Sequence, residues 1–195
     1  TDRGDIPVEE LRAGCKVLTE DNGFQELVSS MSRVVEASGL RGNPKLYPVR
    51  ITAGALGSGL PKRDLVVSRQ HRMAVKSNIV KRMFGAETVL VAAIRLTELP
   101  GIYVDETVES VEYFHLVFKK HEVVFAEGTP TESFLMNFET QKTLTRAQRD
   151  EFASLFPEVG ETGYRGAPAH AIPPRLLQKE LVRRHAKNAR DLLSA

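Results

Sequence analysis

The sequence predicts an all-β domain over residues 1–138, followed by a helical C-terminal extension over residues 139–195. Up to residue 138, short runs of β-branched and aromatic residues alternate with turns rich in Gly, Pro, Asn and Asp, which is typical of a many-stranded domain. After residue 139 the pattern changes to two segments with helix signals. With 195 residues and 42% hydrophobic content, the chain is long enough for one sizeable core.

The composition excludes several classes of protein. The formal net charge is +2 and acidic and basic residues are interspersed over most of the chain, which is not typical of a nucleic-acid-binding protein. Apolar runs stay well below the roughly 18 residues that a membrane span needs, and no signal peptide is visible. The single Cys15 excludes an internal disulfide and a multi-cysteine metal site. We expect no metal and no cofactor, and the compartment is not readable from these features.

The first third of the chain predicts short strands separated by turns. Residues 15–19, "CKVLT", read as a strand that ends at the turn signal "EDNG". Residues 24–38 are compatible with either a strand or a helix. Residues 39–48, "GLRGNPKLYP", are predicted to be a loop because of their Gly, Asn and Pro content.

The middle of the chain carries the strongest strand patterns. Residues 49–68 alternate strand-like pieces with Gly-rich turns, and β-branched residues favour a strand over a helix in residues 87–96, "ETVLVAAIRL". Residues 111–128 hold two apolar stretches on either side of Lys119-Lys120, which predicts a hairpin.

Two helices and a linker are predicted after residue 139. Thr145 with Gln148 three residues later forms a capping-box pattern, and Pro157 is expected to end that helix. Residues 160–174 read as a linker, and residues 175–193 as a basic amphipathic helix. That helix could dock on an acidic partner or a membrane surface, or its leucines could pack on the β domain.

Ser68 and His71 interrupt an apolar run, "DLVVSRQHRMAV". Side chains three positions apart point to opposite faces of a straight strand, so these two converge only if the chain bends between them. A bend that carries a hydroxyl and an imidazole is either a polar turn or a site.

The other chemically capable residues have structural interpretations beside the functional ones. His115 and His121 flank the predicted hairpin, whereas His170 and His185 are expected to be solvated surface residues. Cys15 is expected to be a small buried hydrophobe rather than a reactive thiol. A hydrolase acting in trans would need a full nucleophile and base set, and the G-x-S-x-G nucleophile elbow is missing.

Three blocks of the sequence resemble Hint domains, the hedgehog/intein fold. They are "TDRGDIPVEELRAGCKVLTEDNG" near the start, "LVVSRQH" with Ser68 in the place of a usual Thr, and "VEYFHLVFKKHEVVFAEG" with His121 at the late histidine. The phrase "HEVVFAEGTPTESF" is similar to the bacterial Hint-type branch, which implies an exported or extracellular bacterial parent protein. The resemblance covers about residues 1–138 and implies a compact, pseudo-symmetric β horseshoe.

The resemblance also implies chemistry on the protein's own backbone. In the family, a Cys or Ser just upstream of the residue matched by Thr1 attacks the preceding carbonyl in an N-to-S acyl shift, and that nucleophile is expected to lie outside this chain. His71 would then protonate the departing nitrogen, Ser68 would polarise the scissile bond, and His121 would orient groups or handle a second proton. These catalytic residues are expected to cluster beside Thr1.

The match also implies limits on the activity. The terminal His-Asn pair of splicing inteins falls near Glu132-Ser133, so we expect cleavage at the N-terminal edge without full splicing. With its nucleophile absent, the chain itself is expected to be inactive. The alternative is a non-catalytic Hint scaffold that serves as a structural or partner-binding module of a larger protein.

Overall fold

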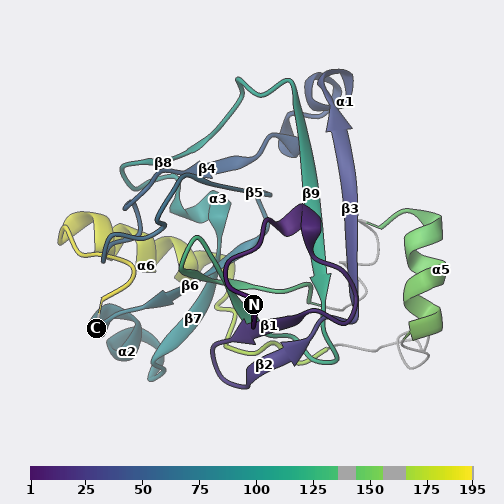
Figure 1. The fold of residues 1–195 in the computed structure, drawn as a ribbon. Coiled ribbons are helices and arrows are strands. Elements are labelled where there is room, and N and C mark those ends of the chain that lie inside the picture. Colours follow the sequence, from purple (N-terminus) through teal and green to yellow (C-terminus); the bar gives the residue numbers. More distant parts are fainter. Residues whose placement is uncertain (136–143, 156–165, 195) are drawn as a thin grey trace. The chain divides into compact units, whose positions relative to one another are not determined.

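The computed structural model describes residues 1–135, 144–155 and 166–194. The chain, drawn in Figure 1, forms two compact units. Unit 1 consists of Thr1–Met31, Phe114–Glu122 and Ser133–Ala169, and unit 2 of Ser32–Tyr113, Val123–Glu132 and His170–Ala195.

Strands make up most of the described elements. In chain order they are β1 (Lys16–Thr19), β2 (Gly23–Glu26), β3 (Ser29–Glu36), β4 (Val49–Ile51), β5 (Leu65–Val67), β6 (Arg72–Lys76), β7 (Thr88–Ala92), β8 (Ile102–Val104), β9 (Ser110–Val117), β10 (Val123–Ala126) and β11 (Thr129–Glu132). The helices are η1 (Val8–Glu10), α1 (Ala37–Gly42), η2 (Pro44–Leu46), α2 (Asn78–Phe84), α3 (Ala93–Leu96), α5 (Arg146–Leu155) and α6 (Arg175–Lys187). The predicted all-β class with a C-terminal helix is therefore confirmed.

Unit 1 contains the predicted N-terminal strand and turn. β1 and β2 pair as an antiparallel hairpin, with Lys16 opposite Glu26 and Thr19 opposite Gly23. The Thr19 hydroxyl donates a hydrogen bond to the Gly23 carbonyl at 2.8 Å, which closes the turn. Residues 24–38, which the sequence left open between strand and helix, hold β2, β3 and the start of α1.

The strands around Lys119-Lys120 do not form the predicted hairpin. β9 pairs with β3, whereas β10 pairs with β11 in an antiparallel ladder with Ala126 opposite Thr129. The two loop residues of that ladder, Glu127 and Gly128, have φ values of +51° and +77°, as the tight two-residue turns of hairpins require. The turn geometry at Glu127-Gly128, rather than the two lysines, selects the pairing.

Two sheets form the body of unit 2. β6 pairs antiparallel with β7 and with β11, so β11 lies between β6 and β10. β4 lies between β5 and β8 in a second antiparallel sheet. Between residues 87 and 96, β7 gives way to α3 at Ala93, so the predicted strand covers only part of this run.

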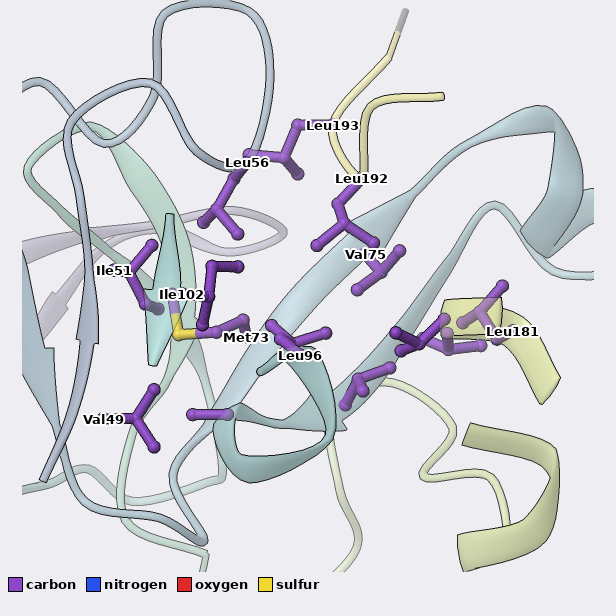
Figure 2. Close-up of a cluster of buried hydrophobic side chains, with 14 of the residues drawn as sticks. Val49, Ile51, Leu56, Met73, Val75, Leu96, Ile102, Leu181, Leu192 and Leu193 are labelled. Carbon is purple, nitrogen blue, oxygen red and sulfur yellow. The ribbon is translucent and has the colours of Figure 1, made fainter. Parts of the chain in front are cut away.

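The main hydrophobic core lies in unit 2 and includes residues from the C-terminal segment (Figure 2). Leu181 and Val182 of α6 are fully buried in this cluster. The side chains labelled in the figure are Val49, Ile51, Leu56, Met73, Val75, Leu96, Ile102, Leu181, Leu192 and Leu193. Packing of α6 through its apolar face confirms the structural interpretation of this helix.

α6 is shorter than the predicted helix over residues 175–193. It ends at Lys187, and Leu193 beyond it forms a parallel bridge with Lys76. Leu177, in the first turn of α6, is 44% exposed, so not every leucine of the helix is on its buried face. Burial of Leu192 and Leu193 depends on the extended segment after the helix, which returns the chain to β6.

His185 is a buried residue of α6, not the solvated surface histidine that was expected. Its exposed fraction is 0%. Its Nε2 lies 3.1 Å from the Ser77 hydroxyl and its Nδ1 lies 3.0 Å from the carbonyl oxygen of Arg190. Both ring nitrogens are thus partnered, which is how a buried polar group is tolerated. His170 is half-buried.

Of the remaining helix and loop signals in the sequence, the structure confirms the capping box and contradicts the loop predicted over residues 39–48. The capping box is confirmed: Thr145 N–H donates to Gln148 Oε1 at 2.9 Å, and Gln148 N–H donates to Thr145 Oγ1 at 3.2 Å. Residues 39–48 hold α1 and η2, so the predicted loop was wrong there. Pro44 begins η2 because a proline suits the first turn of a helix. Pro157 lies outside the described residues.

Three expectations about organisation have different outcomes. No helix among the described residues is long and apolar enough to cross a membrane. The horseshoe shape of the β domain and the domain boundary between residues 138 and 139 stay predictions. Residues 166–174 form no helix or strand beyond a bridge from Ala171 to Val89, consistent with the linker predicted over 160–174.

Candidate active site

The chain turns sharply between Ser68 and His71, as the sequence predicted. Ser68 follows β5 directly, and His71 precedes β6. The backbone N–H of His71 donates to the carbonyl of Ser68 at 3.1 Å, which closes a four-residue turn. Both side chains are half-buried. The bend that both interpretations of this motif required is therefore present.

The start of α3 holds this turn in place. The N–H of Ala93 donates to the carbonyl of His71 at 2.8 Å, and the N–H of Ile94 donates to the carbonyl of Arg69 at 3.0 Å. The first N–H groups of a helix have no partner within the helix, so they are available for such bonds. The turn is attached at two points to the junction of β7 and α3.

The imidazole of His71 is oriented by Thr131 of β11. Its Nε2 lies 2.5 Å from Thr131 Oγ1, and Thr131 Oγ1 donates to the carbonyl of Arg72 at 3.2 Å. A hydroxyl has one proton. Since the Arg72 carbonyl accepts that proton, the oxygen is left to accept the Nε2–H of His71. Thr131 was not identified from the sequence, because only the register of β11 against β6 brings it to His71.

A partly buried ion pair lies beside this hydrogen bond, since the Arg72 side chain is 23% exposed. Glu132, 8% exposed, accepts the backbone N–H of Arg72 at 2.8 Å and the Nη1 of Arg72 at 2.8 Å. Arg72 thus donates one bond to each oxygen of the Glu132 carboxylate, and these two bonds fix the start of β6. The last residue of the turn, His71, therefore joins a strand that is held firmly at its first position.

His121 lies in unit 1 and has a buried ring. Its exposed fraction is 8%, and its Nδ1 accepts the backbone N–H of Ala169 at 3.0 Å. Because Nδ1 is the acceptor, the neutral ring carries its proton on Nε2. The ring lines a cavity of about 480 Å³, together with residues of the β1–β2 turn and the segment Gly166 to Ala169.

The neighbour of His121 is a buried carboxylate. Glu122 is 3% exposed and accepts the Nδ2–H of Asn22 at 2.8 Å. Its backbone N–H donates to Ser133 Oγ at 2.9 Å, and its carbonyl accepts the Ser133 N–H at 2.8 Å. These bonds fix the backbone next to His121. The sequence offered no signal for Asn22, since it is a hundred residues away in the chain.

Thr1 forms a tight turn at the start of unit 1. Its hydroxyl donates to the carbonyl of Gly4 at 2.7 Å and accepts the N–H of Arg3 at 3.1 Å. Gly4 has φ of +96°, a conformation that favours glycine. The N–H of Asp2 donates to the carbonyl of Lys16, which attaches the turn to β1.

The remaining candidates have structural surroundings. Cys15 is half-buried rather than buried, with Arg3 Nη2 3.7 Å from its sulfur. The ring of His115 packs against Phe134 with centroids 4.7 Å apart. Among the described residues no group of acidic, His or Cys side chains could hold a metal ion.

The predicted site residues divide between the two units. Ser68 and His71 belong to one turn of unit 2, whereas Thr1 and His121 belong to unit 1. Their convergence at one peptide bond stays a prediction.

A family model described as a Hint domain matches residues 1–137. No curated protein and no solved structure matches the chain.

Proposed function

The chain belongs to the Hint domain family, and from that premise we propose that it is an autoprocessing domain that cleaves the peptide bond at its own N-terminal edge. The observation that carries this proposal is the turn from Ser68 to His71, in which a hydroxyl and an oriented imidazole sit three residues apart. The substrate is the protein's own polypeptide, and no metal or cofactor takes part.

The first step is an acyl shift from nitrogen to sulfur. The thiol of a cysteine a few residues upstream of Thr1 attacks the carbonyl carbon of the residue before that cysteine, so that a C–S bond forms and the thiol loses its proton. The C–N bond breaks, and the departing nitrogen takes a proton and leaves as an amine. With its Nε2–H held by Thr131, His71 takes the thiol proton on Nδ1 and as the acid passes it to that nitrogen, and the Ser68 hydroxyl polarises the scissile amide. His121 is the second proton-handling or orienting group.

The second step resolves the thioester. Water attacks the thioester carbonyl, the C–S bond breaks, and the upstream segment leaves as a carboxylic acid while the thiol is restored. Splicing does not follow, because Glu132 and Ser133 occupy the place of the pair that would release a C-terminal segment. Glu132 is instead committed to Arg72, and Ser133 to Glu122.

The geometry around His71 supports its role as an acid. A proton donor works best when its ring orientation is set before the substrate arrives. Here the Thr131 hydroxyl holds the ring, the ion pair of Arg72 with Glu132 holds the adjoining strand, and α3 holds the turn. Three independent contacts thus preorganise one imidazole.

A second candidate is a Hint scaffold without catalysis. The structural use of Glu132 and Ser133 favours it, since both residues serve to join strands and turns. In that case the hydrogen bonds around His71 serve stability alone.

The experiment uses a longer chain that includes the native segment upstream of Thr1. Intact mass is measured over time, with and without a strong thiol or hydroxylamine, for the parent and for His71→Ala. Gln70→Ala is the matched control, because Gln70 is an exposed residue of the same turn. Thiol-accelerated cleavage just before the upstream cysteine, kept in Gln70→Ala and lost in His71→Ala, supports autoprocessing. A chain that stays intact under all conditions supports the scaffold, and equal cleavage in both variants contradicts the role of His71.

A further inference from the structure

A cluster of three arginines lies next to the Ser68–His71 turn, and it has no part in the steps described above. Arg69 is in the turn itself, Arg95 is in α3, and Arg175 is the first residue of α6. All three belong to unit 2. Arg69 and Arg95 are half-buried, and Arg175 is exposed.

Backbone contacts bring the three residues together. The carbonyl of Arg69 accepts the N–H of Ile94, which directly precedes Arg95. On the other side, the side chain of Gln178 in α6 accepts the N–H of Ala92 at 3.2 Å. Gln178 lies one helical turn after Arg175, so both residues are on the same side of α6. α3 and α6 are also in direct contact (Figure 1).

The charges of Arg69 and Arg175 both act on Arg95. Burial lowers the pKa of Arg95, and the charges of Arg175 and Arg69 lower it further. Only Glu98 opposes them, and it is exposed. Within the described residues none of the three arginines has an ion pair. By contrast, Arg183 and Arg184 on the same helix are both paired with Glu180.

Guanidinium groups that have no ion pair within the described residues keep N–H donors available for a ligand. Guanidinium groups bind carboxylates through paired N–H donors. Like charges that repel one another in the folded protein are relieved when an anion binds between them. The rest of the surface lacks a wide basic field, because the net charge is only +2, which favours a compact carboxylate ligand over a nucleic acid.

We propose that Arg69, Arg95 and Arg175 form an acidic-peptide recognition site, which selects Asp or Glu side chains in the polypeptide segment that binds at the Ser68–His71 turn. This inference rests on the proposed function, since that segment is the protein's own upstream chain. It adds a sequence preference to the cleavage: upstream segments with acidic residues are held at the turn, and neutral ones are held less well.

Binding is tested with the 195-residue chain and a dye-labelled, glutamate-rich peptide, followed by fluorescence anisotropy. A glutamine-matched peptide is the ligand control. The variant Arg69→Gln/Arg95→Gln/Arg175→Gln is compared with Lys45→Gln/Lys187→Gln/Arg190→Gln, which removes the same charge from three exposed positions of unit 2. We expect the first variant to weaken binding about tenfold, since three partly exposed charge pairs together contribute roughly that factor, and the second to leave it nearly unchanged.

Several outcomes would overturn the inference. These are equal binding of the two peptides, equal weakening by the two triple variants, absence of binding at low salt, and displacement of the peptide by a tighter-binding single-stranded oligonucleotide. Thermal unfolding provides a second readout that does not depend on the peptide. Arg95→Gln should raise the midpoint by removing a repelled charge, and sulfate should raise it in the parent but not in the triple arginine variant.

A cleavage assay separates this inference from the proposed function. Two longer chains are compared, one with glutamates placed in the upstream segment and one with glutamines at the same positions (the amide version). If the amide version is cleaved more slowly, and this difference disappears in the triple arginine variant, both the proposed function and the recognition site are supported. Equal cleavage of both versions overturns the recognition site alone. Absence of any cleavage rejects the proposed function, while the binding experiment still decides the arginine cluster.

Discussion

The hydroxyl of Thr131 joins the imidazole of His71 to the neighbouring strand. It lies 2.5 Å from His71 Nε2 and donates to the carbonyl of Arg72 at 3.2 Å. Thr131 stands opposite Met73 in the pairing of β11 with β6. A residue sixty positions away in the sequence thus sets the ring that we propose as the acid.

Thr131→Val should slow N-terminal cleavage of the longer chain about tenfold. The change keeps the shape of the side chain but removes the hydrogen bond to His71, which contributes about 1 to 1.5 kcal/mol. Thr131→Ser should restore most of the rate, because it returns the hydroxyl. Rates come from intact mass over time. A rate for Thr131→Val equal to that of the parent would show that the bond has no role in the chemistry.

Thr129→Val, the same substitution two positions earlier in β11, should stabilise the protein. Thr129 is 0% exposed, and its hydroxyl has no hydrogen-bond partner among the described residues. A buried hydroxyl without a partner costs about 1 to 3 kcal/mol, which an isosteric methyl group avoids. We expect the free energy of unfolding in urea to rise by about 1 kcal/mol. A lower value would mean that the hydroxyl is satisfied in solution.

His185 should make the stability of the protein depend on pH. Burial lowers its pKa from the ordinary value of 6.5, while the Arg190 carbonyl opposes this shift. The unfolded chain therefore binds a proton more readily than the folded chain below about pH 6.5. Stability should be complete above that pH and decrease as the pH falls towards the folded pKa, by at most about 1.4 kcal/mol per pH unit.

The measurement for His185 is urea unfolding from pH 7.5 to 5, followed by circular dichroism. His185→Gln should have a flatter pH profile, whereas His170→Gln, at a half-buried position before α6, serves as the control. If the profiles of the parent and His185→Gln are parallel, another group causes the pH dependence.

Asp105→Asn should destabilise the protein by about 1 to 3 kcal/mol. The hydroxyl of Thr107 and then the guanidinium of Arg50, 2.7 Å away, lower the pKa of this buried carboxyl. Removing the charge of Asp105 leaves Arg50 without its nearest ion-pair partner. Because Arg50 is 27% exposed, the loss of folding free energy is smaller than for a fully buried ion pair.

The control for Asp105 is Asp64→Asn. Asp64 is 46% exposed and lies 3.5 Å from the same guanidinium, so its loss should cost less than about 0.5 kcal/mol. Because the folded pKa of Asp105 is depressed, its contribution is present above about pH 4 and disappears as the pH falls through the folded pKa. Equal unfolding free energies for the two variants would contradict a special role for Asp105.

Signals confined to a few neighbouring residues were interpreted correctly. The capping box of Thr145 and Gln148, the turn after Thr19 and the bend from Ser68 to His71 each depend on contacts within four residues. Such contacts follow from side-chain chemistry and backbone preference, which the sequence displays directly.

The sequence-based predictions were wrong where the same residues were compatible with more than one local structure. The lysines at 119 and 120 suggested a hairpin turn, but Glu127 and Gly128 adopt the positive φ values that such a turn needs. His185 was expected in solvent because it lies in a basic segment, yet it faces the core between Ser77 and Arg190. Burial of one face of a helix depends on what packs against it, which the segment itself does not contain.

The amino-acid sequence alone predicts the all-β class, carries the Hint resemblance and points to Ser68, His71 and His121 as candidate residues. These follow from periodicity, turn chemistry and motif order, all of which are local or linear properties of the chain. Three relationships become visible only in the folded chain: Thr131 contacts His71, the N–H of Ala169 binds His121, and three arginines lie beside the turn. Each of these depends on strand register or helix packing between segments far apart in sequence, and that register is decided by the whole core rather than by any one stretch.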